Sequence, residues 1–175
     1  MNRETKFIIG VTLGTIILLV GGIFLLSKSS TGYTGSVTGA DRFVSDVEAQ
    51  GLEANPVSID IGKVGYGDGV VSKEYEVRNT TSATMKLRKI VTSCMCTKAR
   101  VKIGDKATKF YAMEMNGDKN PIIDYDLPAG ATAKIEFQFD PAAHGPAGIG
   151  LIDRVITLYF DGGFKEFKFN GEVVK

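Results

Sequence analysis

The stretch TAKIEFQFD, residues 132–140, decides the fold because its apolar and polar residues alternate without a break. In an extended chain Ile135, Phe137 and Phe139 point to one side, and the polar residues between them point to the other. This period of two is typical of a strand that buries one face in a core and exposes the other to water. The stretch therefore predicts a β-strand with one face in the core and the other face in water.

Other segments after residue 56 have the same character: they are short and rich in Val, Ile, Phe, Tyr and Thr. These predicted strands are VSIDIGKV (57–64), VVSKEYEVRN (70–79), TMKLRKIVTS (84–93), KARVKI (98–103), KFYAMEM (109–115), RVITLYF (154–160) and FKEFKFNGEV (164–173). The segments between them, such as GYGDG, NGDKNP and DPAAHGPAG, contain the Gly, Pro, Asn and Asp of turns. About eight short strands without intervening helices predict an all-β, antiparallel β-sandwich over residues 56–175.

The N-terminal part of the chain predicts a membrane anchor. Residues 7–26, FIIGVTLGTIILLVGGIFLL, contain no charge. As a helix they would span roughly 30 Å, which is the thickness of a bilayer's hydrocarbon core. Arg3 and Lys6 precede the segment and Lys28 alone follows it closely. The excess of positive charge on the N-terminal side predicts that residues 1–6 lie in the cytoplasm and that the remaining chain lies outside. We therefore expect one uncleaved transmembrane helix.

Two further features concern this anchor and the segment after it. Gly10 and Gly14 have the spacing that lets two membrane helices approach closely, so they are candidates for helix packing in the membrane. Residues 27–55 are predicted to form a flexible tether because their first half is rich in Ser, Thr and Gly. Within the tether, residues 43–50 could form a short helix that ends at Gly51.

The order of the motifs in the outer domain resembles a known family. IDIGKV, EYEVRNTTSATMKLRKIVTSCMCT, LPAGATAKIEFQFDPAAHG, ITLYF and FNGEV follow one another as in the bacterial domain-of-unknown-function family 1573. This family is immunoglobulin-like and related to the major sperm protein and PapD-like group. The most specific element is Ser93-Cys94-x-Cys96-Thr97, where Met95 replaces the glycine of the family pattern. Residues 103–124 look like an insertion. The resemblance implies an immunoglobulin-like sandwich at a bacterial cell membrane.

Cys94 and Cys96 are the two cysteines of the chain, and their spacing permits several roles. In an extended segment both would lie on one face, too far apart for an easy disulfide, although a local turn could bring them together. An extracytoplasmic location permits such an oxidation, and the bond would be readily reduced. Alternatively both are buried as small apolar residues. We expect a structural cysteine pair first, with side chains turned towards the sandwich, metal or thiol chemistry second, and a role linked to a partner third.

A metal site would bind copper rather than a hard cation. Two thiolates on one face suit Cu(I), a soft ion that also accepts thioether ligands. Met113 and Met115 repeat the spacing of the cysteines, and His144 is the single histidine of the chain. These three residues and the two cysteines are the weak metal candidates. A lone histidine in a loop is more often solvated than functional, so no cofactor is the first expectation and copper is the alternative.

Composition and motifs argue against several classes of function. The formal net charge is +1, from 21 basic and 20 acidic residues, which gives no footprint for nucleic acid. No phosphate loop, nucleophile elbow or carboxylate pair is apparent, so we do not expect an enzyme. The sequence favours a membrane-anchored module that binds other proteins, with a subunit of a larger membrane complex as a related hypothesis. The alternative is a copper- or thiol-handling protein that uses Cys94 and Cys96.

Overall fold

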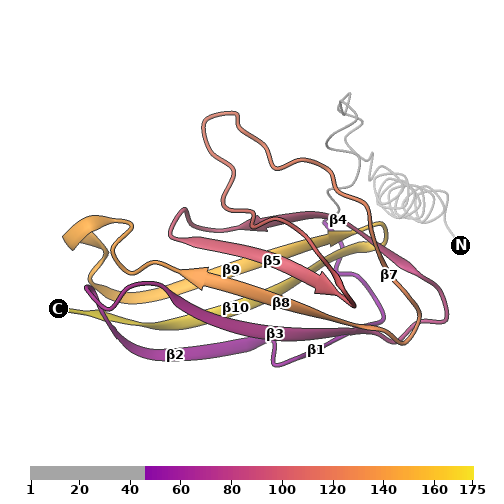
Figure 1. Cartoon of the computed structure of the whole chain (residues 1–175), viewed down its shortest axis with the longest axis horizontal. Coiled ribbons are helices and arrows are strands. Elements are labelled where there is room, and N and C mark those ends of the chain that lie inside the picture. The colour runs from indigo at the N-terminus through magenta and orange to yellow at the C-terminus, as the bar shows by residue number, and fades with distance from the viewer. Residues whose placement is uncertain (1–45) are drawn as a thin grey trace, which may run out of the picture. The chain divides into compact units, whose positions relative to one another are not determined.

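The computed structural model describes residues 46–175, which contain ten β-strands and one short 3-10 helix. The strands lie in two layers (Figure 1). Their bounds are β1 Leu52–Asn55, β2 Ser58–Gly65, β3 Val71–Asn79, β4 Met85–Thr92, β5 Thr97–Ile103, β6 Lys106–Ala107, β7 Tyr125–Leu127, β8 Thr132–Phe139, β9 Gly150–Phe160 and β10 Gly163–Val174. The 3-10 helix η1 covers Gly145–Gly148.

The strand order is that of an immunoglobulin-like sandwich, as predicted. One sheet has the order β1-β3-β8-β5-β6 and the other has the order β2-β10-β9-β4-β7. The prediction of a wholly antiparallel arrangement is wrong at one place, because β2 pairs with β10 in parallel. This arises from a change of sheet at the start of the domain. β1 pairs with β3, and after the cis bond between Asn55 and Pro56 the chain joins the other sheet as β2.

The core lies between the two sheets and is rich in aromatic side chains. Ile135, Phe137 and Phe139 are all buried, which confirms the alternation of β8. Phe137 stacks on Phe169 of β10, with 4.4 Å between their ring centroids. Tyr75 of β3 lies against Phe137 at 5.4 Å and donates its hydroxyl hydrogen to the Lys168 carbonyl at 2.6 Å. Burial of these large apolar rings is the main contribution to the stability of the sandwich.

The segment predicted as a strand at residues 109–115 is instead part of a long irregular loop. Figure 1 shows this loop rising from the sandwich between β5 and β7. Tyr111 makes an isolated bridge to Ala99. The Glu114 carboxylate forms an ion pair with the buried Lys89 of β4, with 2.6 Å between Lys89 Nζ and the nearer carboxylate oxygen. The loop is therefore held by a few specific contacts, whereas its sequence alternates as a strand does.

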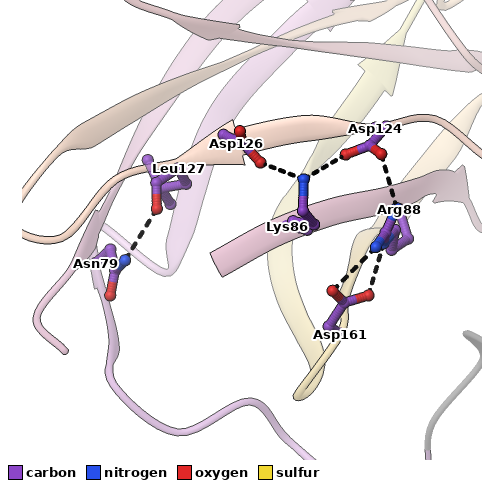
Figure 2. A network of polar contacts seen from close by, with 7 residues as sticks. All are labelled: Asn79, Lys86, Arg88, Asp124, Asp126, Leu127 and Asp161. Atoms are coloured by element: carbon purple, nitrogen blue, oxygen red, sulfur yellow. Dashed lines mark hydrogen bonds and ion pairs between the residues drawn. The ribbon is translucent and has the colours of Figure 1, made fainter. Parts of the chain in front are cut away.

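A network of ion pairs attaches the end of this loop and β7 to β4 (Figure 2). The Lys86 ammonium contacts Asp126 at 2.6 Å and Asp124 at 2.9 Å, and these hydrogen bonds raise the pKa of Lys86. Arg88 donates two hydrogen bonds to the Asp161 carboxylate, from Nε at 2.6 Å and from Nη2 at 3.1 Å. Its third contact, at 3.2 Å, is to Asp124. The ion pairs thus hold the end of the insertion and β7 against β4, and β7 is the edge strand of this sheet.

The domain begins earlier than predicted. Residues 52–55, expected in the tether, form β1 at a sheet edge. The described part of the predicted helix, residues 46–50, is not helical, because Glu48 bridges Phe164 of β10 and the Ala49 amide donates to the Phe164 carbonyl at 2.7 Å. Within residues 46–175 no helix has the length and apolar character needed to cross a membrane. The predicted anchor, with Gly10 and Gly14, lies outside the described residues.

Candidate functional site

The two cysteines lie in a tight turn, residues 93–96, where the chain leaves β4 in one sheet and enters β5 in the other. Hydrogen bonds fix both sides of this turn. The Thr92 hydroxyl is 3.0 Å from the carbonyl oxygens of both Cys94 and Thr97. Ser93 is joined to Val155 of β9 by two bonds of 2.9 Å, one through its amide and one through its hydroxyl. The turn is therefore anchored to the sandwich rather than projecting freely from it.

Cys94 and Cys96 form a disulfide. The expectation of an extended segment is wrong here, because the Thr97 amide bonds back to the Cys94 carbonyl at 3.1 Å and closes the chain into a turn. The two Cα atoms are 5.3 Å apart, compared with about 6.6 Å for residues two apart in a strand. Both side chains are buried against the core, as predicted. That the pair serves structure first stays a prediction.

His144 comes to the cysteines from the loop between β8 and β9. This loop, residues 140–149, lies at the same end of the sandwich as the cysteine turn (Figure 1). The Asp140 amide donates to the Cys96 carbonyl at 2.9 Å and joins loop and turn. His144 is exposed, and its Nε2 atom is 3.0 Å from the Cys94 sulfur. A loop histidine fifty residues from the cysteines is thus brought into direct contact with one of them.

Two N–H groups are directed at the sulfur atoms. The Arg154 Nε of β9 donates to the Cys96 sulfur at 3.3 Å, and the Cys96 amide donates to the Cys94 sulfur at 3.3 Å. Both interactions would favour the thiolate form of a reduced cysteine. Arg154 was not among the site residues predicted from the sequence. Its signal was a basic residue at the start of RVITLYF, a stretch that has no other charge.

A small pocket opens beside the disulfide. Its volume is about 200 Å³, and its lining residues are Val70, Met95, Cys96, Lys98, Gln138, Asp140 and Ala143. Val70 and Met95 are 57% and 49% exposed and line the same pocket, so two apolar side chains are exposed together at this place on the surface. We call these residues, the turn 93–96 and the loop 140–149 the cysteine end of the domain.

The remaining metal candidates lie elsewhere. Met113 and Met115 belong to the irregular loop between β6 and β7, and they are 38% and 39% exposed. Neither lines the pocket at Cys96. Among the described residues, the group of potential His, Cys, Asp and Glu ligands at this end consists of Cys94, Cys96 and His144, whose donor atoms all lie within 4.8 Å of one another. The structure therefore brings three of the five sequence candidates together.

The sequence itself has no match that would show a family: no family model and no curated protein matches the chain. Among solved structures, the chain is similar to a protein of unknown function from Porphyromonas gingivalis, with 14% identity and a TM-score of 0.52. The match covers 81% of this chain and 51% of that one, so this chain spans about half the length of the Porphyromonas protein. At this identity the likeness shows the fold alone.

Two weaker likenesses are to a PapD-like domain and to a member of the MSP family. The seventh PapD-like domain of human CEP192 is 14% identical, with 83% of this chain and 97% of that chain covered and a TM-score of 0.41. A C. elegans member of the MSP family is 10% identical, with 71% and 98% covered and a TM-score of 0.36. With these low TM-scores neither carries an argument. Membership of family 1573 stays a prediction.

Proposed function

We propose that this chain is a membrane-anchored module that presents its immunoglobulin-like domain outside the bacterial cytoplasmic membrane and binds another protein through its cysteine end. The anchor is the uncharged segment 7–26, and the positive residues before it set the orientation. No catalytic role is part of the proposal.

The observation that carries the proposal is the exposure of Val70 and Met95 around one pocket. An apolar side chain on the surface gains free energy when a partner removes it from water, about 25 cal/mol for each Å² buried. Methionine is among the residue types enriched at protein interfaces. Lys98 and Asp140 line the same pocket and supply the charged rim that fixes the orientation of a partner. End loops on a rigid sandwich are also a common place for binding residues.

The free edge of β2 is a less favourable binding surface. β2 is an edge strand of eight residues, and such an edge can accept a strand from another chain. Two of its backbone amides are already used: the Gly62 amide donates to the Asp60 carboxylate at 2.7 Å, and the Gly65 amide donates to the Asp68 carboxylate at 2.8 Å. A partner strand would have to displace these bonds. The geometry therefore favours the cysteine end.

Site-specific photo-crosslinking in intact cells tests the proposal. A photoreactive amino acid replaces Met95 in the full-length protein, and the matched control carries it at Val47, an apolar residue that is 64% exposed beside the turn between β9 and β10. We expect a discrete cross-linked product from position 95 and not from position 47, with the partner identified by mass spectrometry. Equal labelling at both positions, or no product at position 95, would refute binding through this end.

The same experiment addresses a role as a subunit of a membrane complex. Such a role predicts that a stable complex survives detergent extraction and that the product at position 95 contains one of its integral components. The mass of the mature protein tests the anchor separately, because an uncleaved chain retains residues 7–26. A mature N-terminus after residue 26 would contradict membrane anchoring without affecting the cross-linking result.

A further inference from the structure

Three side chains of types that can ligate a metal meet at the cysteine end, although they come from two separate segments. The Cys94 and Cys96 sulfurs belong to the turn after β4, and the His144 ring belongs to the loop after β8. Their donor atoms lie within 4.8 Å of one another, with 3.0 Å between the Cys94 sulfur and the His144 Nε2. Ligands that share one metal ion at bonds of about 2.0–2.3 Å must lie within about 4.6 Å of one another. The two sulfurs are bonded in the disulfide and must separate on reduction, after which a small adjustment places all three atoms around one ion.

We propose that the reduced form of this site binds one Cu(I) ion through Cys94, Cys96 and His144, and that formation of the disulfide releases the ion. This assignment goes beyond the proposed protein-binding function and does not depend on it. Soft thiolate ligands favour Cu(I), which accepts three ligands. A structural Zn²⁺ site takes four, and among the described residues no fourth His, Cys, Asp or Glu joins the group.

The redox step requires a reductant, and we assign this role to a thiol compound or a protein dithiol. Its two thiols become a disulfide, while the Cys94–Cys96 bond breaks and each sulfur gains one electron and one proton. Binding of Cu(I) then releases the thiol protons, because the thiolate is the ligand. In the reverse direction an oxidant of the disulfide class takes the two electrons and the S–S bond forms again. Copper keeps its +1 charge throughout.

The surroundings of the sulfurs suit this ion. Two thiolates with one Cu(I) carry a net charge of −1, and the Arg154 guanidinium, 3.3 Å from the Cys96 sulfur, provides a compensating positive charge. The Cys96 amide, 3.3 Å from the Cys94 sulfur, orients that ligand through an N–H···S hydrogen bond. Neither N–H donor is consumed when the disulfide is reduced, so both are available to the thiolates.

The site is also accessible to a metal donor and to a reductant. His144 is exposed, and the pocket of about 200 Å³ includes Cys96 in its lining. Met95 lies at the same pocket with 49% of its surface exposed. Cys94 and Cys96 are only 8% and 3% exposed, so a small thiol in this pocket approaches the disulfide from the Cys96 side. Cu(I) can enter by the same route.

The experiment compares the full-length protein in detergent before and after reduction by a dithiol that is then removed under anaerobic conditions. Cu(I) is supplied from a coloured chelator complex, and its transfer is followed by absorbance. We expect one Cu(I) per chain for the reduced protein and none for the oxidised protein. X-ray absorption should show both sulfur and nitrogen ligands. Circular dichroism of the same samples shows whether the reduced protein keeps its β structure.

Variants then assign the ligands. H144A should weaken Cu(I) binding by at least about tenfold, since loss of even an outer-shell partner costs that much. The double variant C94S/C96S should abolish binding. M113L/M115L is the matched control, because these thioethers lie outside the pocket, and it should bind as the wild type does. Failure of the reduced protein to bind Cu(I) or to stay folded, unchanged affinity in H144A, or preferential binding of Zn²⁺ would each overturn the proposal.

Discussion

The ion pair between Lys89 and Glu114 provides a sharp test of how the insertion is held. Lys89 is 4% exposed on β4, and its ammonium lies 2.6 Å from the Glu114 carboxylate. The same carboxylate oxygen accepts a hydrogen bond from the backbone amide of Asn120 at 2.8 Å. Replacing Glu114 with alanine leaves a buried positive charge without this partner. Because ions are strongly hydrated in the unfolded chain, an unpaired buried charge destabilises the folded state.

The expected loss can be worked out from the burial of the two side chains. Breaking a fully buried pair costs about 3–5 kcal/mol. The Glu114 side chain is 25% exposed, so water can partly replace it beside Lys89. We therefore expect E114A to lower the free energy of unfolding by about 2–3 kcal/mol. E114Q keeps an oxygen for both donors and removes only the charge, so it should lose less.

Urea denaturation of the full-length protein and its variants measures these differences. The matched control is E74A, which removes an exposed pair of 2.7 Å between Glu74 and Lys134 and should cost less than about 1 kcal/mol. The double variant K89M/E114M should recover most of the stability, because apolar side chains of similar size can replace a buried pair. If E114A costs no more than E74A, the buried pair does not hold the insertion and the reasoning fails.

Three further predictions concern the rest of the sandwich. G163A should lower the free energy of unfolding by about 2–3 kcal/mol, because Gly163 has φ +136° and an added Cβ would collide with the Val47 carbonyl. The control G162A adds a Cβ in open space and should leave the free energy of unfolding nearly unchanged in the same denaturation assay. N79A should lower the free energy of unfolding by about 2–3 kcal/mol at pH 7, because the buried side-chain amide of Asn79 donates to the carbonyls of residues 83, 127 and 128. Figure 2 shows the contact to residue 127. A fall in melting temperature of less than about 2 °C would contradict this prediction. Burial raises the pKa of Tyr75 above its usual value, so its contribution to stability is fully present below about pH 10 and is lost as the pH rises further. Y75F should therefore lose less stability than the wild type between about pH 9 and pH 11. An equal loss in both proteins would argue against this cause.

Strand positions could be predicted from the sequence because burial leaves a period of two. This worked for β8, where Ile135, Phe137 and Phe139 alternate with polar residues and all three are buried. The same pattern failed at residues 109–115, because alternation says nothing about whether a neighbouring strand is available for pairing. The parallel pairing of β2 with β10 was also not predicted, since periodicity is the same for both directions.

The candidate site was predicted only in part. The spacing of Cys94 and Cys96 drew attention to the right turn, but the period of the preceding strand was extended too far, into a segment that turns. The approach of His144 and Arg154 depends on contacts between residues that are distant in the sequence. The loop after β8 is set by the Asp140 amide on the Cys96 carbonyl, a backbone bond that leaves no signal in the sequence. Local patterns therefore found the sulfurs but not their partners.

The parallel pairing of β2 with β10 has a mechanical consequence. The pair runs from Ser58 opposite Lys168 to Gly65 opposite Val174, so the beginning of β2 and the end of β10 lie at opposite ends of the ladder. Tension applied between these two points pulls the strands past each other along their length. Shear of this kind loads the backbone hydrogen bonds between them together, whereas peeling would break them one after another. A domain held by its N-terminal side and pulled at its C-terminus would therefore resist extension through this pair of strands.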